Sequence, residues 1–504
     1  MKRTIFFILF FVTLVLLISS ATKKSKNSKA RELPQMADIT KLQKLLAEKA
    51  IKLPCENNPI AIHKMTADPC VLIYNDTIYI YGTNDAQQAE FTNGKEANAY
   101  NKINTLNVFC SKDMVNWQDC GEIAVAGKNN PDGAAKWASN SWAPAIASKK
   151  INGKDKFFLY FADSANGIGV LTADNPLGPF KDPLGKGLIT RDNPQTKGIH
   201  WLFDPAVFID DDGTGYLYCG GGVQDDPAHP RSARCVKLGD DMISLASDLI
   251  EIDAPWLFED SGINKINGKY YYSYCSNWAD RTGVKDPQMS PIAVIAYMTS
   301  DKPLGPFKYQ GYLWENPGAF FGCSGNNHHW IFQFKNKWYI AYHAQTTEKL
   351  IGFEQGGYRN LFIDELKLEK DGSFKPQRGT KEGVEPVAAF NPYQTVNATT
   401  CCSSANIAFT AKHTILNIKD DAWLLVKNAD LSKGLETLTA TAADNSKGTI
   451  RFMIDNWANG TEIASVSIDG KKSKASIKDV KLNGIHNLYL VISGSVELID
   501  WKFN

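Results

Sequence analysis

The sequence has little of several features that mark particular classes of protein. Its 504 residues carry 55 Lys and Arg against 54 Asp and Glu, so the formal net charge is only +1. A nucleic-acid-binding protein needs a basic surface, so this balance argues against nucleic acid as a partner. No Cys-x-x-Cys pair and no Cys/His spacing typical of a zinc site occurs. After one apolar run at residues 5–18, no later segment looks transmembrane.

The N-terminus has the layout of a secretory signal. Two basic residues at positions 2 and 3 precede the apolar run, and small residues at 19–21 follow it as a cleavage site. We interpret residues 1–21 as a signal peptide, with a retained membrane anchor as the alternative. The mature protein is then expected to be secreted or periplasmic, with no membrane partner after cleavage.

Export would permit disulfides, and the chain has ten cysteines. Cys110 and Cys120 flank a turn-like stretch, while Cys219 and Cys235 lie on two successive strand-like runs. Either pair could bridge neighbouring strands, although sequence alone cannot establish pairing. Free buried thiols are the alternative for most of the ten.

A repeat of strand-like segments begins near residue 68. Each copy has a lead residue, an apolar strand, a turn and an aromatic strand. The five lead residues are Asp68, Trp142, Asp204, Glu259 and His328. They lie 55 to 74 residues apart, which is enough for one four-stranded sheet each. The repeat predicts a five-bladed β-propeller, assigned to residues 55–388.

The segments on either side of this repeat have different residue patterns. Residues 22–54 are predicted to be a flexible linker followed by a short helix, capped by Asp38 and carrying Leu42, Leu45 and Leu46 on one face. Residues 391–504 contain new strand-like runs without the repeat, which favours a β-sandwich of the jelly-roll type. The expected fold class is therefore all-β, a five-bladed propeller followed by a sandwich.

Three of the lead residues are carboxylic acids, namely Asp68, Asp204 and Glu259. The innermost strands of a propeller line its channel, so these side chains should converge. Hydrolysis of a glycosidic bond needs one carboxylic acid to protonate the leaving oxygen and a second carboxylate to act as base or nucleophile. A third carboxylate would raise the pKa of the acid by repulsion. The alternative, calcium chelation, needs more oxygen ligands than the lead positions offer.

Residues 60–390 resemble glycoside hydrolase family 43, with the closest likeness to arabinoxylan arabinofuranohydrolases, which are often paired with a family 6 carbohydrate-binding module. The matching stretches are KWASNSWAPAIA, GIGVLTADNPLGPF, WLFDPAVFIDDDGTGYLY, FEDSGINKINGKYYYSYC, NPGAFFGCSGNNHHWIFQFKNKWYIAYHAQT and GYRNLFIDEL. The resemblance implies an inverting hydrolase that releases L-arabinofuranose from arabinoxylan, a plant cell-wall polysaccharide. It implies no required cofactor.

The resemblance also implies roles for single residues. The general base falls on Asp68, the general acid on Glu259, and the carboxylate that tunes and orients the acid on Asp204. His328 falls on an axial histidine that often coordinates a channel calcium, directly or through water. The resemblance therefore allows a structural calcium at His328. Arg359 falls on an arginine that contacts the sugar, and His328 is expected to bind substrate as well.

Two further expectations concern substrate contact. Trp142 is a candidate for sugar binding, because flat aromatic faces suit the C–H faces of sugars. The C-terminal domain ends like a family 6 module but lacks the usual Trp-containing stretch, so both sugar binding and a purely structural role stay open. Truncation near Phe390 is expected to leave turnover of a small aryl arabinoside nearly intact if the propeller folds alone.

Three functional hypotheses remain open. The first is an exported arabinofuranosidase, expected to be a monomer. The second is a β-xylosidase, arabinanase or endo-xylanase on the same scaffold. The third is a non-catalytic carbohydrate-binding propeller, against which the presence of all three carboxylates weighs.

Overall fold

The computed structural model describes residues 39–223 and 228–504, and its regular structure is almost entirely β. The predicted signal peptide and most of the predicted linker lie outside the described residues. The described helices are α1 (Lys41–Lys49), α2 (Asp85–Thr92), α3 (Gly318–Phe321), α4 (Thr346–Ile351) and a 3₁₀ turn (Pro194–Thr196). None of the helices in these two ranges has the length and apolar character needed to cross a membrane. The all-β fold class is confirmed.

Five antiparallel sheets follow one another from residue 67 to residue 365, and the strands of each pair in chain order. The strands are β1 (Ala67–Tyr74), β2 (Thr77–Thr83), β3 (Thr105–Ser111) and β4 (Gln118–Ala124); β5 (Trp142–Ile151), β6 (Lys154–Ala162), β7 (Gly167–Ala173) and β8 (Ile189–Thr190); β9 (Ala206–Ile209), β10 (Gly215–Cys219), β11 (Ala233–Lys237) and β12 (Ile250–Ile252); β13 (Leu257–Ile266), β14 (Lys269–Ser276), β15 (Ile295–Ser300) and β16 (Lys308–Trp314); and β17 (His329–Phe334), β18 (Lys337–Ala344) and β19 (Asn360–Glu365). Four sheets have the expected four strands, and the fifth has three.

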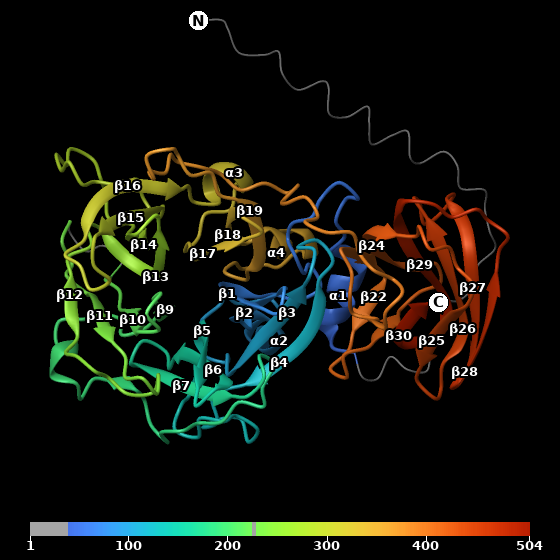
Figure 1. Ribbon diagram of the computed structural model, residues 1–504, viewed down its shortest axis with the longest axis horizontal. Helices are drawn as coiled ribbons and strands as arrows, with labels where there is room; N and C mark the ends of the chain where they lie inside the picture. Colours follow the sequence, from blue (N-terminus) through green and yellow to red (C-terminus); the bar gives the residue numbers. More distant parts are fainter. Residues whose placement is uncertain (1–38, 224–227) are drawn as a thin grey trace, which may run out of the picture. The chain divides into compact units, whose positions relative to one another are not determined.

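The first strands of these sheets form a closed ring. Strand β1 contacts β5, β5 contacts β9, β9 contacts β13, β13 contacts β17, and β17 contacts β1 again. Figure 1 shows the five sheets around this ring, running from blue through green to yellow. Residues at the starts of these strands therefore meet, although the sequence separates them widely.

Four of the five first strands have a residue in the left-handed backbone conformation, with positive φ, near their start. These residues are Asp68, Ala143, Asp204 and Asp260, with φ of 49°, 41°, 49° and 68°. The pairing register shifts at this point in β1, β5 and β13, which is the mark of a β-bulge. The sequence repeat had placed Trp142 and Glu259 at this position, one residue too early. The offset matters because successive strand side chains point to opposite faces.

Helix α1 begins at a different cap from the predicted one. Thr40 is the N-cap: its hydroxyl accepts a hydrogen bond from the Gln43 amide at 3.2 Å, and the Gln43 side chain accepts one from the Thr40 amide at 3.0 Å. This reciprocal pair is a capping box. The predicted cap, Asp38, lies outside the described residues, while Leu42 and Leu46 are buried as expected and Leu45 is partly exposed.

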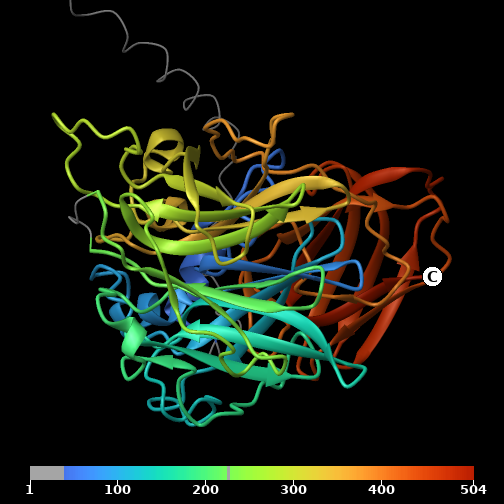
Figure 2. The ribbon, with the colours of Figure 1, turned by 60° about the vertical axis from the view of Figure 1, so that its left-hand side comes forward.

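The chain after residue 390 forms two more sheets. One contains β20 (Val396–Asn397), β30 (Glu497–Phe503), β23 (Ile415–Asn417) and β22 (Ile407–Phe409), with β25 (Leu438–Ala442) paired to β30; the other contains β21 (Ser403–Ala405), β24 (Ala422–Asp430), β29 (Ile485–Ser495), β26 (Lys447–Ile454), β27 (Thr461–Asp469) and β28 (Lys472–Ile477). Leu424, Phe452, Leu490 and Trp501 from both sheets share one buried core. Figure 2 shows these strands in orange and red.

These C-terminal sheets are hydrogen-bonded to the preceding part of the chain. The backbones of Trp117 and Cys401 exchange two hydrogen bonds, of 2.9 and 3.1 Å. Asn116 makes two more with the Lys427 backbone, both of 2.8 Å. The His63 ring stacks on Phe409 with centroids 3.6 Å apart. The described residues, 39–223 and 228–504, accordingly belong to one compact unit.

The structure separates one of the two suggested cysteine pairs. Cys219 stands opposite Arg234 in the β10–β11 pairing, and Cys235 stands opposite Tyr218. Residues directly opposite share a face, and adjacent residues do not, so Cys219 and Cys235 lie on opposite faces of their sheet. They belong to two different buried clusters. The suggestion that they bridge is therefore wrong.

The other pair, Cys110 and Cys120, has its sulfur atoms 2.9 Å apart, and both residues are partly exposed. We expect oxidised glutathione to convert these thiols into a disulfide, because the two thiols can pass two electrons and two protons to the glutathione disulfide without a large movement. Peptide mapping after alkylation should find residues 110 and 120 cross-linked. Cys219→Ser should leave the cross-link unchanged, and alkylation of both thiols in the treated protein would contradict the expectation.

Candidate active site

The three predicted carboxylates meet at the starts of three first strands. Asp68 belongs to β1, Glu259 belongs to β13, and Asp204 lies two residues before β9. All three are buried, with 5%, 6% and 5% of their surfaces exposed. His328 lies between two of them, with Nδ1 3.5 Å from Asp68 Oδ1 and 3.7 Å from Asp204 Oδ2. The ring of first strands thus gathers four of the predicted site residues.

Asp68 is held in its ionised form. Burial alone would raise the pKa of this carboxyl, but the Arg359 guanidinium and the His328 ring beside it hold the pKa well below its ordinary value. Arg359 Nη1 donates to Asp68 Oδ1 at 2.7 Å. The Asp68 amide donates to His343 Nδ1 at 3.2 Å, so that nitrogen carries no proton. Asp68 is therefore a carboxylate at neutral pH, ready to accept a proton.

Arg359 is itself fixed by a second carboxylate. Asp85, the first residue of α2, is fully buried and receives Arg359 Nε at 2.8 Å and Nη2 at 2.9 Å. Such a two-point pair fixes the plane of the guanidinium as well as its position. The guanidinium also lies over the Tyr100 ring, 5.0 Å from its centre. Arg359 therefore presents its remaining nitrogen to Asp68 with little freedom.

Glu259 is in the opposite state. Its Oε1 is buried without a hydrogen-bond partner. Burial raises the pKa of Glu259 well above its ordinary value, and the nearby charges of Asp204, Asp68 and Asp260 raise it further, with Arg359 opposing them. A carboxyl in such surroundings keeps its proton near neutral pH and can donate it.

Asp204 lies between these two extremes. Burial raises the pKa of Asp204 to about 7, with His328 opposing the rise and Asp68 adding to it. Its Oδ2 accepts a hydrogen bond from the Asp260 amide at 3.0 Å. A carboxylate at this place repels a second negative charge on Glu259, which favours the protonated form of Glu259.

Comparison with known proteins shows the family of the chain. Residues 57–374 match the family model described as "Glycosyl hydrolases family 43". An arabinoxylan arabinofuranohydrolase of Paenibacillus polymyxa is 44% identical over 480 residues, covering 90% of this chain and 75% of the relative. The chain belongs to glycosyl hydrolase family 43. It is a glycoside hydrolase.

The similarity to family 43 enzymes extends over nearly the whole chain. An arabinoxylan arabinofuranohydrolase of Bacillus subtilis (strain 168) is 43% identical, covering 87% of this chain and 90% of the relative. A crystal structure of a family 43 arabinoxylan arabinofuranohydrolase from Bacillus subtilis, in complex with cellotetraose, superposes with a TM-score of 0.84 at 41% identity. That structure covers 91% of this chain and is itself covered to 99%.

The groups around His328 are the place where the resemblance to family 43 led us to expect a calcium ion. Its Nε2 lies 3.2 Å from Asp260 Oδ1, and its Nδ1 faces Asp68 and Asp204. Burial alone would lower the pKa of His328, but these three carboxylates raise it. Within the described residues no group of three or more His, Cys, Asp or Glu is placed to hold a metal ion. Calcium binding by His328, directly or through water, therefore stays a prediction, and no step below uses a metal ion.

Trp142 lies next to the acidic cluster rather than in it. Its Nε1 donates to the Tyr100 carbonyl at 3.0 Å, and the two rings meet edge to face at 6.1 Å. Tyr100 in turn lies under Arg359, and Trp142 is partly exposed. Contact between the Trp142 ring and sugar stays a prediction.

Five residues of the site were not found from the sequence: Asp85, Tyr100, Asp260, His329 and His343. Asp260 and His329 directly follow predicted residues, so the doubled acid and the doubled histidine were visible signals. His343 lies inside a stretch that resembles the family, in AYHAQT. Nothing in the sequence around Asp85 or Tyr100 connects either residue to Arg359, because only the fold brings them together.

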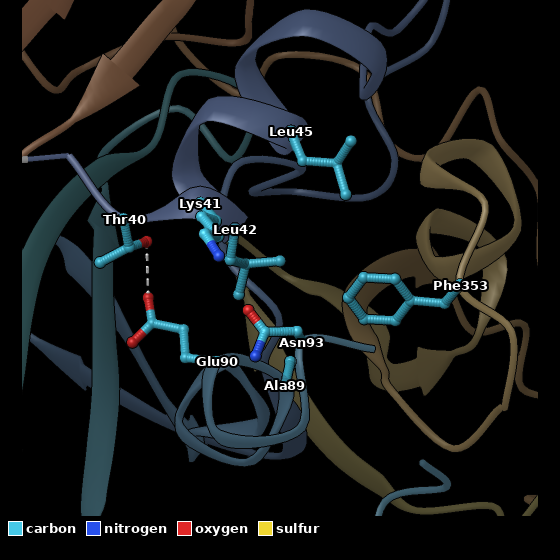
Figure 3. A pocket seen from close by; sticks show the side chains of 8 residues that line it. All are labelled: Thr40, Lys41, Leu42, Leu45, Ala89, Glu90, Asn93 and Phe353. Atoms are coloured by element: carbon cyan, nitrogen blue, oxygen red, sulfur yellow. Dashed lines mark hydrogen bonds between the residues drawn. The ribbon is translucent and has the colours of Figure 1, made fainter. Parts of the chain in front are cut away.

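A cavity of about 410 Å³ lies apart from the acidic cluster, between α1, α2 and Phe353 (Figure 3). Its lining residues are Thr40, Lys41, Leu42, Leu45, Ala89, Glu90, Asn93 and Phe353. The Thr40 hydroxyl donates to Glu90 Oε1 at 2.9 Å across one side of it. None of these residues belongs to the acidic cluster, so this cavity is not the candidate active site.

Proposed function

We propose that this family 43 enzyme releases L-arabinofuranose side chains from arabinoxylan. The single observation that carries the chemistry is the contrast between two buried carboxyls: Arg359 holds Asp68 ionised, whereas Glu259 has an unpartnered oxygen and a raised pKa. Acid–base hydrolysis of a glycosidic bond requires this contrast. The similarity to two arabinoxylan arabinofuranohydrolases supports the choice of sugar and polymer.

In this proposal Glu259 donates its proton to the leaving glycosidic oxygen. Asp68 accepts a proton from a water molecule, whose oxygen attacks the anomeric carbon from the opposite face. The bond from that carbon to the leaving oxygen breaks as the new bond to water forms, so the anomer is inverted. Asp204 keeps Glu259 protonated, and Arg359 keeps Asp68 ionised. Asp68 then loses its proton to solvent and Glu259 takes one up, which restores both groups to their starting states.

The proposal extends to the architecture. The ring of first strands supports the assignment of the five sheets as blades of a propeller. The two C-terminal sheets around one core support a β-sandwich. Export in a secreted or periplasmic form rests on the N-terminal sequence alone.

Substrate choice is tested by incubating the purified enzyme with arabinoxylan, linear arabinan and unsubstituted xylan and identifying the products. Free arabinose from arabinoxylan, with little release from the other two, is the expected result. Xylose or xylo-oligosaccharides from unsubstituted xylan would favour a xylosidase or endo-xylanase, and oligosaccharides from linear arabinan would favour an arabinanase.

The stereochemistry of the product is a separate prediction. If Asp68 activates water, proton NMR of the fresh product should show the anomer opposite to that of the substrate, before mutarotation mixes the two. The carboxyls of Asp68 and Glu259 should then lie about 6.5–9.5 Å apart, which leaves room for the water. Retention of the anomer would instead assign Asp68 as a nucleophile.

A further inference from the structure

Asp260 is a fully buried carboxylate that the proposed chemistry does not use. It contacts three groups of the site. Its amide donates to Asp204 Oδ2 at 3.0 Å. Its Oδ1 makes no hydrogen bond but lies at ion-pair distance, 3.2 Å, from His328 Nε2. Its Oδ2 receives both the amide of His329, at 3.1 Å, and Nδ1 of His329, at 2.5 Å. A buried charge with this many partners has a fixed place.

The partners of Asp260 are themselves held from behind. His329 is fully buried, and its Nε2 lies 2.7 Å from the Ser273 hydroxyl, so the ring is fixed at both nitrogens. His329 therefore aims Asp260 Oδ2, which leaves Oδ1 facing His328. The chain of contacts runs from Ser273 in β14 through His329 in β17 to Asp260 in β13.

The position of the His328 ring matters because one ring nitrogen lies near two carboxylates, Asp68 and Asp204. One ring edge faces Asp260, and the other faces both Asp68 and Asp204 at 3.5 and 3.7 Å. Without the carboxylate behind Nε2, the ring could turn about its Cβ–Cγ bond and move Nδ1 away from both. Asp204 would also lose its alignment if the bulge at Asp260 relaxed, because the Asp260 amide holds its Oδ2.

We propose that Asp260 is a positioning residue for the acid–base pair: it holds His328 between Asp68 and Asp204 and anchors Asp204 through its amide. The inference rests on the proposed roles of Asp68 and Asp204. Asp260 has no exposed surface and cannot touch the substrate. Its loss should therefore change turnover rather than substrate binding.

The first test is Asp260→Asn, assayed with an aryl arabinofuranoside. The amide oxygen can still accept from His329, but the negative charge facing His328 is gone. We expect kcat to fall about 10- to 100-fold, the range of coupling energies between two residues in direct contact, while KM changes less than about twofold. An unchanged kcat, or a loss confined to KM, would overturn the proposal.

The second test asks whether Asp260 acts through His328. Asp260→Asn is compared in the wild-type background and in a His328→Gln background. If the side chain of Asp260 works by holding His328, the substitution should lower kcat much less once His328 has been replaced. The same factor in both backgrounds would show that the two residues act independently and would overturn the proposal.

Two further variants keep the result interpretable. Asp364→Asn is a matched control, because Asp364 is a buried carboxylate that accepts from the Tyr342 hydroxyl at 2.8 Å outside the acidic cluster. It should lower the melting temperature and spare kcat.

If Asp260→Asn does not fold, a second variant tests the same inference. His329→Phe removes the side-chain support while leaving Asp260 in place, and it should lower kcat with the same dependence on His328. Full kcat in that variant would overturn the proposal.

The choice of substrate separates this inference from the proposed function. The aryl arabinofuranoside decides whether Asp260 positions His328, and it does so without reference to any polysaccharide. The arabinoxylan assay decides the natural substrate. An enzyme that cleaves the aryl glycoside but releases nothing from arabinoxylan would contradict the proposed function alone, and an unchanged kcat in Asp260→Asn would contradict this inference alone.

Discussion

Glu259→Gln should lower kcat on arabinoxylan by about 100-fold or more, because glutamine keeps the shape of the side chain but has no proton to transfer. The loss should be much smaller on aryl arabinofuranosides with good leaving groups, since these need little protonation to depart. Measuring kcat across a series of aryl leaving groups checks the prediction. An equal loss on every substrate would remove Glu259 from the role of general acid.

The pH profile provides an independent measurement on the same variant. Burial and neighbouring carboxylates raise the pKa of Glu259, and the acid acts only while protonated, so wild-type activity should fall as pH rises through that pKa. Glu259→Gln should lack this alkaline limb. Asp364→Asn is a matched control, because burial also raises the pKa of Asp364, to about 6, outside the acidic cluster. The control should keep both the limb and the wild-type dependence on the leaving group.

Removal of residues 391–504 should abolish soluble, active enzyme, contrary to the expectation from sequence that the propeller would work alone. The truncation strips the backbone partner of Trp117, the Lys427 partner of Asn116 and the ring that stacks on His63. Trp117 is only 1% exposed in the whole chain, so a large apolar ring would lie next to broken hydrogen bonds. Soluble yield, circular dichroism and turnover of an aryl arabinofuranoside measure the outcome.

A milder variant tests whether the contacts between residues 391–504 and the preceding chain stabilise the enzyme. Lys427→Ala removes only the bond from Lys427 Nζ to Asn57 Oδ1, of 2.7 Å, and leaves the backbone contacts in place. It should lower the melting temperature modestly while kcat stays unchanged, because no residue of the acidic cluster moves. A soluble truncate with wild-type kcat would show instead that the five preceding sheets fold alone and that the packed C-terminal sheets are dispensable for hydrolysis.

The sequence alone determined the features that are local or that recur with a fixed spacing. Strand alternation and the repeated lead residues predicted five sheets within residues 55–388, and the structure has five between residues 67 and 365. Three acids in that repeat predicted the carboxylates that the structure brings together. His328 and Arg359 were predicted as well, through motifs that resemble the family. In each case the information lies in neighbouring residues or in the period of the repeat.

Only the tertiary structure decided which side chains control those carboxylates. Asp85 fixes Arg359 across 274 residues of sequence, and the bulge in β13 puts Asp260, not Glu259, in register with Asp68 and Asp204. A register offset of one residue likewise sent Cys219 and Cys235 to opposite faces. Such contacts depend on strand register and on ring closure, and a one-residue change in either reverses the face that a side chain occupies.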